Sequence, residues 1–268
     1  RLRGSLAAGC HRNRAVGVLH CQNVVDAVAR HGNGMPRCLH GAHELLLLRG
    51  RDTTEDRVAF RCAGDLLVRD KARGVYECFR ALEQQGHRVD FVKAGKRGVI
   101  APEAVADLVC EDTALVSIMH VNNETGAIND IATIAEAVKA KNPDTMFFAD
   151  GVQAFLRVPF SMNTSKVDYY SVSAHKVHGL KGTGMLFFRK GTPLKAYLLG
   201  GGQESALRSG TENTFGILAF AEASRVFLQD HAQKLAHMER LKTRLRDGLL
   251  SANGAHCFTP DSSAPHIL

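Results

Sequence analysis

Between residues 75 and 250 the chain alternates short apolar runs with longer stretches in which apolar residues recur every three to four positions. The short runs have the length and the aromatic and β-branched content of strands, and the longer stretches have the period of amphipathic helices. The pattern predicts strands over residues 88–95, 113–121, 145–150, 167–173 and 184–191, and helical stretches over 75–86, 101–109, 130–143 and 214–250.

Residues that start or stop helices stand at these boundaries. Pro102 falls in the first turn of one predicted helix, where its missing amide hydrogen is not needed. Asp130 precedes the next helix, Pro143 follows it, and Gly86 ends the first one. Strands that alternate with helices indicate an α/β fold, with a mostly parallel sheet and helices on both faces. In such a sheet, ligands bind beyond the carboxyl ends of the strands.

Polar residues follow three of the predicted strands directly. The segments are NNETG at 122–126, DGVQ at 150–153 and SAHK at 173–176. In one loop alone, these residue types are ordinary turn formers. Because three successive strands end in this way, a binding site at this edge of the sheet is the favoured interpretation.

The residue types in these loops suit pyridoxal phosphate. A lysine in a partly dry pocket, here Lys176, can lose its proton and attack a carbonyl to form an imine. Asp150 can hold the positive charge of a ring nitrogen, while Ser173 and His175 can donate to a phosphate. The separation of Asp150 and Lys176, 176 − 150 = 26 residues, leaves room for one connection and one strand. The two groups are therefore expected at the tips of neighbouring strands.

Two glycine-rich segments, GLKGTG at 179–184 and GGG at 200–202, raise a nucleotide site as an alternative. Neither segment has the spacing of a P-loop or of a dinucleotide-binding turn. A phosphate-binding module without imine chemistry stays open as a second interpretation.

The first quarter of the chain differs from the rest. Residues 1–74 hold 13 basic and 7 acidic residues, whereas the other 194 hold 21 and 20, so most of the net charge of +7 lies there. Its arginines are scattered, which argues against a nucleic-acid or membrane surface. The pairs Cys10-His11 and His20-Cys21 lack a common zinc spacing, so no metal site is expected. The apolar residues of this part also show little regular helical or strand spacing.

Cysteine usage and apolar content bear on the compartment. The seven cysteines form no CxxC pair, which favours reduced thiols and a cytoplasmic location in a chain of 268 residues. No apolar run has the length of a membrane span. Residues 1–18 are rich in arginine and lack acids, so a targeting peptide and a mitochondrial location stay open as the alternative.

Four motifs identify a family. HVNNETG (120–126), ADGVQAF (149–155), SVSAHKVHGLKGTG (171–184) and GGGQESALRSGTEN (200–213) occur in this order. In order and spacing they resemble the cysteine desulfurases and selenocysteine lyases, NifS-like pyridoxal-phosphate enzymes of the class V aminotransferase fold. The resemblance implies the large domain of a type I pyridoxal-phosphate transferase over residues 75–250. It also implies a homodimer that removes sulfur or selenium from L-cysteine or L-selenocysteine, leaving L-alanine and an enzyme-bound persulfide or selenide.

The same resemblance assigns roles to individual residues. Lys176 is the implied Schiff-base lysine, and Lys181 matches a structural lysine of that loop. Asp150 is implied to pair with the pyridinium nitrogen, and Gln153 to bond the ring hydroxyl. The expected catalytic residues are Lys176 and His175, and the expected cofactor-binding residues are Lys176, Asp150, Gln153, Asn123, Ser173, His175 and, at the partner subunit's phosphate, Thr211. A sulfur-acceptor protein and a place in sulfur metabolism, such as iron–sulfur cluster assembly, follow from the same likeness.

The chain also departs from the family. Residues 1–74 lack its Gly-Ala-Thr-Glu phosphate loop and its ring-stacking histidine, so we interpret them as a misread or replaced N-terminus, with a genuine extension as the rival. The family's catalytic cysteine and substrate-carboxylate arginine are expected beyond Leu268, and residues 251–268 are interpreted as the truncated start of a largely missing small domain. Cys257 lacks the setting of the family's nucleophile. The alternative function is therefore an inactive fragment or pseudoenzyme that binds the cofactor weakly or only dimerises.

Overall fold

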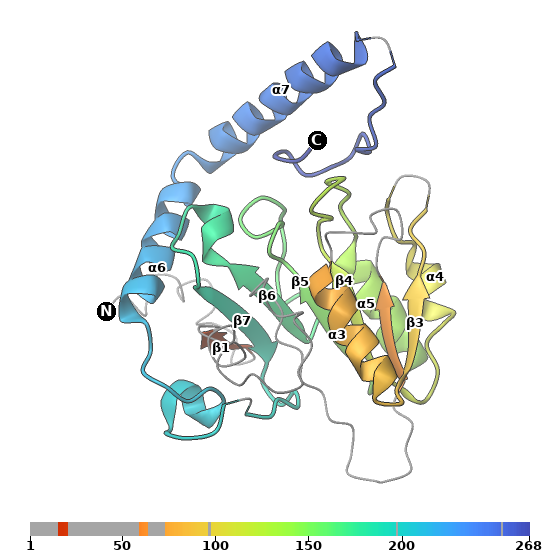
Figure 1. Ribbon diagram of the computed structural model, residues 1–268, viewed down its shortest axis with the longest axis vertical. Helices are drawn as coiled ribbons and strands as arrows, with labels where there is room; N and C mark the ends of the chain where they lie inside the picture. Colours follow the sequence, from red (N-terminus) through yellow and green to blue (C-terminus); the bar gives the residue numbers. More distant parts are fainter. Residues whose placement is uncertain (1–15, 21–58, 64–72, 96–97, 197, 253) are drawn as a thin grey trace.

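A seven-stranded sheet organises the computed structural model, which describes residues 16–20, 59–63, 73–95, 98–196, 198–252 and 254–268, with side chains from Val75 onward. The spatial order of the strands is β1-β7-β6-β5-β4-β2-β3 (Figure 1). The strands are β1 (Val16–His20), β2 (Ala59–Ala63), β3 (Arg88–Val92), β4 (Thr113–Met119), β5 (Met146–Asp150), β6 (Tyr169–Ser173) and β7 (Gly184–Arg189).

Five neighbouring strands, β6, β5, β4, β2 and β3, run parallel, and β7 is antiparallel to both β6 and β1. The mostly parallel sheet is therefore confirmed, and the five strands predicted from the apolar pattern are β3 to β7. Strands β1 and β2 come from within residues 1–74, where the pattern predicts none. That residues 1–74 are misread or replaced stays a prediction.

Helices cover both faces of the sheet, as the sequence pattern predicts. Phe147 lies in one hydrophobic cluster with residues of α4 (Pro102–Ala106) and α5 (Ile131–Lys141). Its neighbour Phe148 lies in another cluster with Phe79 of α3 (Arg73–Gln84). Because successive residues of a strand point to opposite faces, the two phenylalanines anchor separate cores on the two sides of β5.

The predicted helix starts are confirmed where a local cap defines them. Pro102 is the first residue of α4. The carboxylate of Asp130 accepts hydrogen bonds from the amide and the hydroxyl of Thr133, at 3.1 and 2.7 Å, and so caps α5.

The helical stretch predicted over residues 214–250 is two helices, α6 (Thr214–Leu228) and α7 (His231–Leu250). Asp230 between them has a φ of 49°, in the left-handed region, which ends the helical hydrogen-bond ladder. The prediction of one continuous stretch was wrong because apolar residues resume at helical spacing after the break. The six residues 229–234, which contain no large apolar side chain, mark the joint in the sequence.

The last residues of the chain return to the sheet. Figure 1 shows the C-terminus between α7 and the strand ends. Ser263 forms an antiparallel bridge with Ala127, and the amide of Ala264 donates to the carbonyl of Gly126 at 2.8 Å. Ala264 is fully buried in a small cluster with Val121 and Ala154. That residues 251–268 begin a small domain stays a prediction.

Across the described ranges, no helix is both long enough and apolar enough to cross a membrane.

Candidate cofactor-binding site

Three loops with polar side chains meet at the carboxyl edge of β4, β5 and β6. These strands are parallel neighbours, so their last residues lie at the same edge of the sheet. Asp150 ends β5 and pairs in register with Ser171 of β6. Lys176 follows β6 on the 3₁₀ turn η2 (Ala174–Val177). The expectation that Asp150 and Lys176 stand at the tips of neighbouring strands is thus met.

The carboxyl group of Asp150 is held in a buried position. The residue is 6% exposed, and its Oδ1 accepts a hydrogen bond from the amide of Val152 at 2.8 Å. Burial raises the pKa of Asp150 to about 6, while the Val152 amide, the Ser171 hydroxyl and the charge of Lys176 act in the opposite direction. A positive charge brought against this carboxyl group would therefore be favourable.

The lysine loop fixes the direction of its side chains through a tight backbone. His178 closes η2 with a φ of 67°, in the left-handed region. A β-carbon at Gly179 would lie 2.9 Å from Cβ of Ala174, so the loop folds back closely on its own start. The carbonyl of Lys176 accepts a hydrogen bond from Nη2 of Arg157, which anchors the backbone of the lysine to the loop after β5.

Ser173 and His175 are adjacent in space as well as in sequence. The Ser173 hydroxyl and Nδ1 of His175 lie 2.9 Å apart. Burial lowers the pKa of His175, and the charges of Lys176 and Lys181 lower it further. A neutral imidazole and a hydroxyl beside two lysines form a set that can receive an anion such as a phosphate.

The two asparagines after β4 have different roles. Oδ1 of Asn122 accepts hydrogen bonds from the amides of Glu124 and Thr125, at 2.9 and 2.8 Å, and so shapes the turn. Oδ1 of Asn123 is buried and has no hydrogen-bond partner among the described residues. Asn123, the predicted site residue, is therefore the one left free for a ligand.

The remaining predicted residues are Gln153 and Thr211. Gln153 follows Asp150 on the same loop, and its Oε1 lies 3.4 Å from Nε2 of His266. Thr211 is exposed on the segment that leads into α6. Six of the seven predicted residues thus lie on the three loops at the strand ends, and Thr211 does not.

The structure adds two residues that the sequence pattern does not select. Arg157 is 8% exposed, and its Nε and Nη1 have no hydrogen-bond partner within the described part of the chain. Its guanidinium also lies 5.3 Å from the centre of the Phe227 ring. His266 comes from the C-terminal segment, 113 residues after Gln153. Arg157, four positions after Gln153, could have been suspected from the sequence, whereas nothing in the motifs points to His266.

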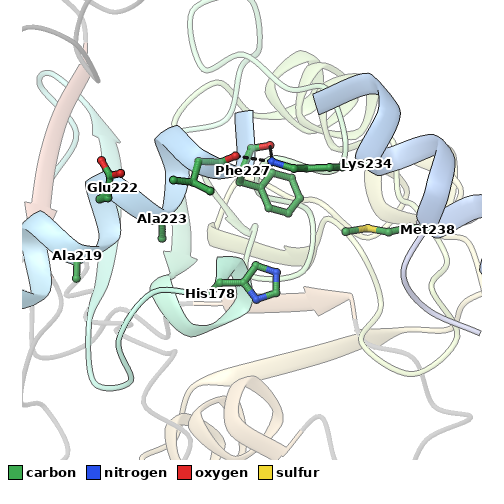
Figure 2. Close-up of a pocket in the computed structure, with 8 residues that line it drawn as sticks. His178, Ala219, Glu222, Ala223, Phe227, Lys234 and Met238 are labelled. Atoms are coloured by element: carbon green, nitrogen blue, oxygen red, sulfur yellow. Dashed lines mark hydrogen bonds between the residues drawn. The ribbon is translucent and has the colours of Figure 1, made fainter. Parts of the chain in front are cut away.

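A cavity of about 600 Å³ lies beside the lysine loop and is lined by none of the predicted site residues. Figure 2 shows His178 on one side of it, with Ala219, Glu222, Ala223 and Phe227 of α6 and Lys234 and Met238 of α7 around it. The ammonium group of Lys234 donates to the carbonyls of Val226 and Phe227, across the joint of the two helices. The cavity therefore belongs to the packing of α6 against α7.

The residues present fit pyridoxal phosphate. Asp150 offers a buried carboxyl group, Asn123 a buried oxygen with no partner in the described part of the chain, and Lys176 an amine just after the neighbouring strand end. Among the side chains that the structure describes, no group of three or more His, Cys, Asp or Glu residues could hold a metal ion. Cys10, His11 and Cys21 lie outside the described residues, and so does the side chain of His20.

Comparison with known proteins gives a consistent result. The aminotransferase class-V family model matches residues 71–267. The cysteine desulfurase IscS of Pseudoalteromonas translucida (strain TAC 125) is 38% identical over 207 residues, which cover 76% of this chain and 51% of that protein. A NifS/IcsS protein homolog of Lactobacillus delbrueckii subsp. bulgaricus is 41% identical over 197 residues, covering 72% of this chain and 51% of that protein.

A solved structure of a NifS-like protein superposes with a TM-score of 0.72 at 40% sequence identity, covering 79% of this chain and 57% of that one. The type I pyridoxal-phosphate fold predicted from the motifs is thereby confirmed. The chain spans about half the length of the curated relatives it matches.

Proposed function

The chain belongs to the aminotransferase class-V family, whose members depend on pyridoxal phosphate, and on this premise we propose that it is a cysteine desulfurase-like protein. Its substrate is L-cysteine, or L-selenocysteine in the alternative, and its amino-acid product is L-alanine. The observation that carries the proposal is the buried carboxyl group of Asp150 on the strand end next to that of Lys176.

Each residue at the strand ends has a part in this function. The bound cofactor supplies a ring that withdraws electrons from the α-carbon of an amino acid and so makes its proton easier to remove. Asp150 holds the positive charge of the ring nitrogen, and Gln153 donates to the ring hydroxyl oxygen. Ser173 and His175 hold the phosphate, and Asn123 contacts the cofactor or the substrate. Nζ of Lys176 takes the proton from the α-carbon and returns one to the product.

The sulfur transfer needs a thiol. In the balanced reaction, the C–S bond of cysteine breaks, the sulfur joins a protein thiol as a persulfide, and a proton completes the methyl group of alanine. We do not assign the role of this thiol to Cys257. That residue is exposed, and its Sγ lies 3.9 Å from the carbonyl of Thr259. A sulfur-acceptor protein then takes the persulfide sulfur, and the cytoplasm is the proposed location.

The proposal includes a homodimer. Thr211 is exposed just before α6, and Phe215 in the first turn of that helix is 83% exposed. An exposed aromatic side chain beside a phosphate-binding candidate is consistent with a site shared between two copies. Thr211→Ala should then weaken cofactor binding in the dimer without lowering the thermal stability of the cofactor-free chain.

The proposed function is tested by mapping the covalent attachment. The purified chain is incubated with pyridoxal phosphate, reduced with borohydride and digested, and the pyridoxyl group is located by mass spectrometry. The label is expected on Lys176 and should be absent from Lys176→Ala. Lys181→Ala, which alters an exposed lysine of the same loop, is the matched control and should keep the label. A label on another residue, or none, contradicts the proposal.

A second measurement separates the two functional alternatives. Alanine is quantified after incubation of the loaded protein with L-cysteine and a thiol acceptor. Labelling of Lys176 together with alanine formation supports the enzyme. Labelling without alanine favours the pseudoenzyme or fragment that only binds the cofactor.

A further inference from the structure

His266 lies against Gln153 although 113 residues separate them in sequence. Nε2 of His266 is 3.4 Å from Oε1 of Gln153, the residue assigned above to the ring hydroxyl. We propose that His266 is a positioning residue that turns the amide of Gln153 so that its NH₂ group faces the cofactor. The inference rests on the proposed function, since it concerns the orientation of a cofactor-binding group.

The segment that carries His266 is held independently of Gln153. Ser263 bridges to Ala127, and the fully buried Ala264 bonds to Gly126. From α7, Nζ of Lys242 donates to the carbonyls of Ser263 and Ala264, at 3.3 and 3.1 Å, and to the Ser263 hydroxyl at 3.0 Å. His266 is therefore presented from a segment with its own anchors and does not depend on Gln153 for its place.

The surroundings of His266 favour one protonation state. Burial lowers the pKa of His266 to about 3, and the charges of Arg157, Lys176 and Lys242 act in the same direction. The imidazole is thus neutral at physiological pH and carries one proton. Nδ1 is buried without a hydrogen-bond partner among the described residues, so a proton there would be an unsatisfied donor. The proton is better placed on Nε2, which faces Gln153.

This tautomer determines which end of the Gln153 amide faces the imidazole. An amide presents an acceptor oxygen and a donor NH₂ group, and a donating Nε2–H selects the oxygen. The NH₂ group is then directed away from His266. The ring hydroxyl oxygen of pyridoxal phosphate is an acceptor when it is ionised, so it requires this donor. Without His266, the amide could turn over and present its oxygen to another oxygen.

Substitutions at position 266 separate positioning from packing. His266→Phe keeps an aromatic ring and removes the donor, whereas His266→Gln keeps an N–H near the place of Nε2. His266→Phe should raise the Kd for pyridoxal phosphate by about three- to tenfold, the range for one lost hydrogen bond. It should also shift the pH midpoint of the bound cofactor's visible absorbance in the direction given by Gln153→Ala. His266→Gln should restore most of both properties.

A double variant tests whether His266 acts through Gln153. In the Gln153→Ala background, His266→Phe should cause no further shift of the absorbance midpoint. A full additional shift would mean that His266 acts directly, and an unchanged spectrum in His266→Phe alone would mean that it has no role. Either result overturns the inference about His266. The proposed function would still be supported if the pyridoxyl label is found on Lys176. Failure of the unaltered chain to bind the cofactor overturns both.

A measurement on the unaltered, cofactor-free chain does not depend on the folding of any variant. Nitrogen-15 NMR of histidine-labelled protein should show His266 as the neutral tautomer with its proton on Nε2. Assignment comes from the loss of that signal in His266→Gln. The Nδ1–H tautomer, or a charged ring at pH 7, would overturn the inference.

Discussion

The ring of Tyr170 fills the space that any side chain at position 151 would need. A β-carbon at Gly151 would lie 2.0 Å from Cζ of this ring. Tyr170 is itself held in place, because its hydroxyl is 3.0 Å from Nδ1 of His120 and its ring stacks on Phe160 with centroids 4.6 Å apart. The residue after the buried Asp150 is therefore restricted to glycine by a tyrosine on the neighbouring strand.

Gly151→Ala should destabilise the chain by about 1–3 kcal/mol, the usual cost of forcing an extra carbon into a packed site. Urea denaturation of the cofactor-free protein measures the loss. In a Tyr170→Ala background the clash is absent, so Gly151→Ala should cost much less there. Gly202→Ala is the matched control, because a β-carbon at Gly202 meets no atom of the described residues within 4 Å and the φ of Gly202 is −85°. Equal losses for Gly151→Ala in both backgrounds would contradict the coupling.

Asp150 should make the cofactor-free protein less stable above pH 6. Burial raises its folded pKa to about 6 from the ordinary 3.8, so the folded state binds more protons than the unfolded state between these values. The stability contributed by the neutral carboxyl group is then lost as the pH rises from about 4 to 6. Above pH 6 the carboxyl group is ionised in both states, and the full cost of burying its charge lowers the stability.

Asp150→Asn removes this cost and keeps an oxygen that can accept from the Val152 amide. At pH 7.5 the variant should gain about 1–3 kcal/mol of stability without cofactor, by the relation of pKa shift to free energy. Near pH 4 most of the gain should vanish. Cofactor affinity should fall, since the ring nitrogen loses its charged partner. Asp144→Asn, at an exposed carboxylate, serves as the control and should change neither quantity. A gain that is the same at both pH values would contradict the assignment.

The joint between α6 and α7 stores backbone strain at one residue. Asp230 has a φ of 49°, and its side chain makes no capping hydrogen bond to α7. Glycine adopts this conformation without the clash of a β-carbon, whereas alanine keeps the clash. Asp230→Gly should therefore be more stable than Asp230→Ala by about 1 kcal/mol in urea denaturation. If the Asp230→Ala variant proved as stable as Asp230→Gly, the left-handed conformation of Asp230 would be contradicted.

The parts of the site that could be predicted are those encoded by neighbouring residues. Asp150 follows an apolar run directly and Lys176 comes four residues after another, so the pattern places both at the edge of a parallel sheet. His266 and Gln153 meet only because the chain returns to the loop after β4, and no local pattern reports a contact over 113 residues. The contact of Gly151 with Tyr170 could not be predicted from a local pattern either, because the pairing of β5 with β6 brings the two residues together.

Two features of the fold were not predicted, and the reasons are similar. Strands β1 and β2 lie among residues without clean periodicity, and only their pairing with β7, β3 and β4 defines them. The break at Asp230 interrupts a stretch whose apolar period resumes afterwards. The periodicity of apolar residues indicates which residues face a core. It does not indicate where a single residue changes the direction of the backbone.

An exposed apolar stripe runs along α7. Leu241, Leu245 and Leu249 recur every four residues and are 52%, 55% and 51% exposed. Residues at this spacing lie on one face of a helix, so together they form a continuous apolar surface. A surface of this kind favours self-association of the chain in water.

Replacing Leu245 and Leu249 with glutamine should weaken this association while leaving the fold intact. Burying a leucine contributes about 1.5–3 kcal/mol, so the loss of two half-exposed leucines should raise the dissociation constant of self-association by at least about tenfold. Sedimentation velocity at several concentrations measures the change, and thermal unfolding checks the fold. Arg244→Gln is the matched control, because it places the same residue at an exposed position of α7 outside the stripe. An association constant that is unchanged in the double variant would mean that the chain associates through another surface.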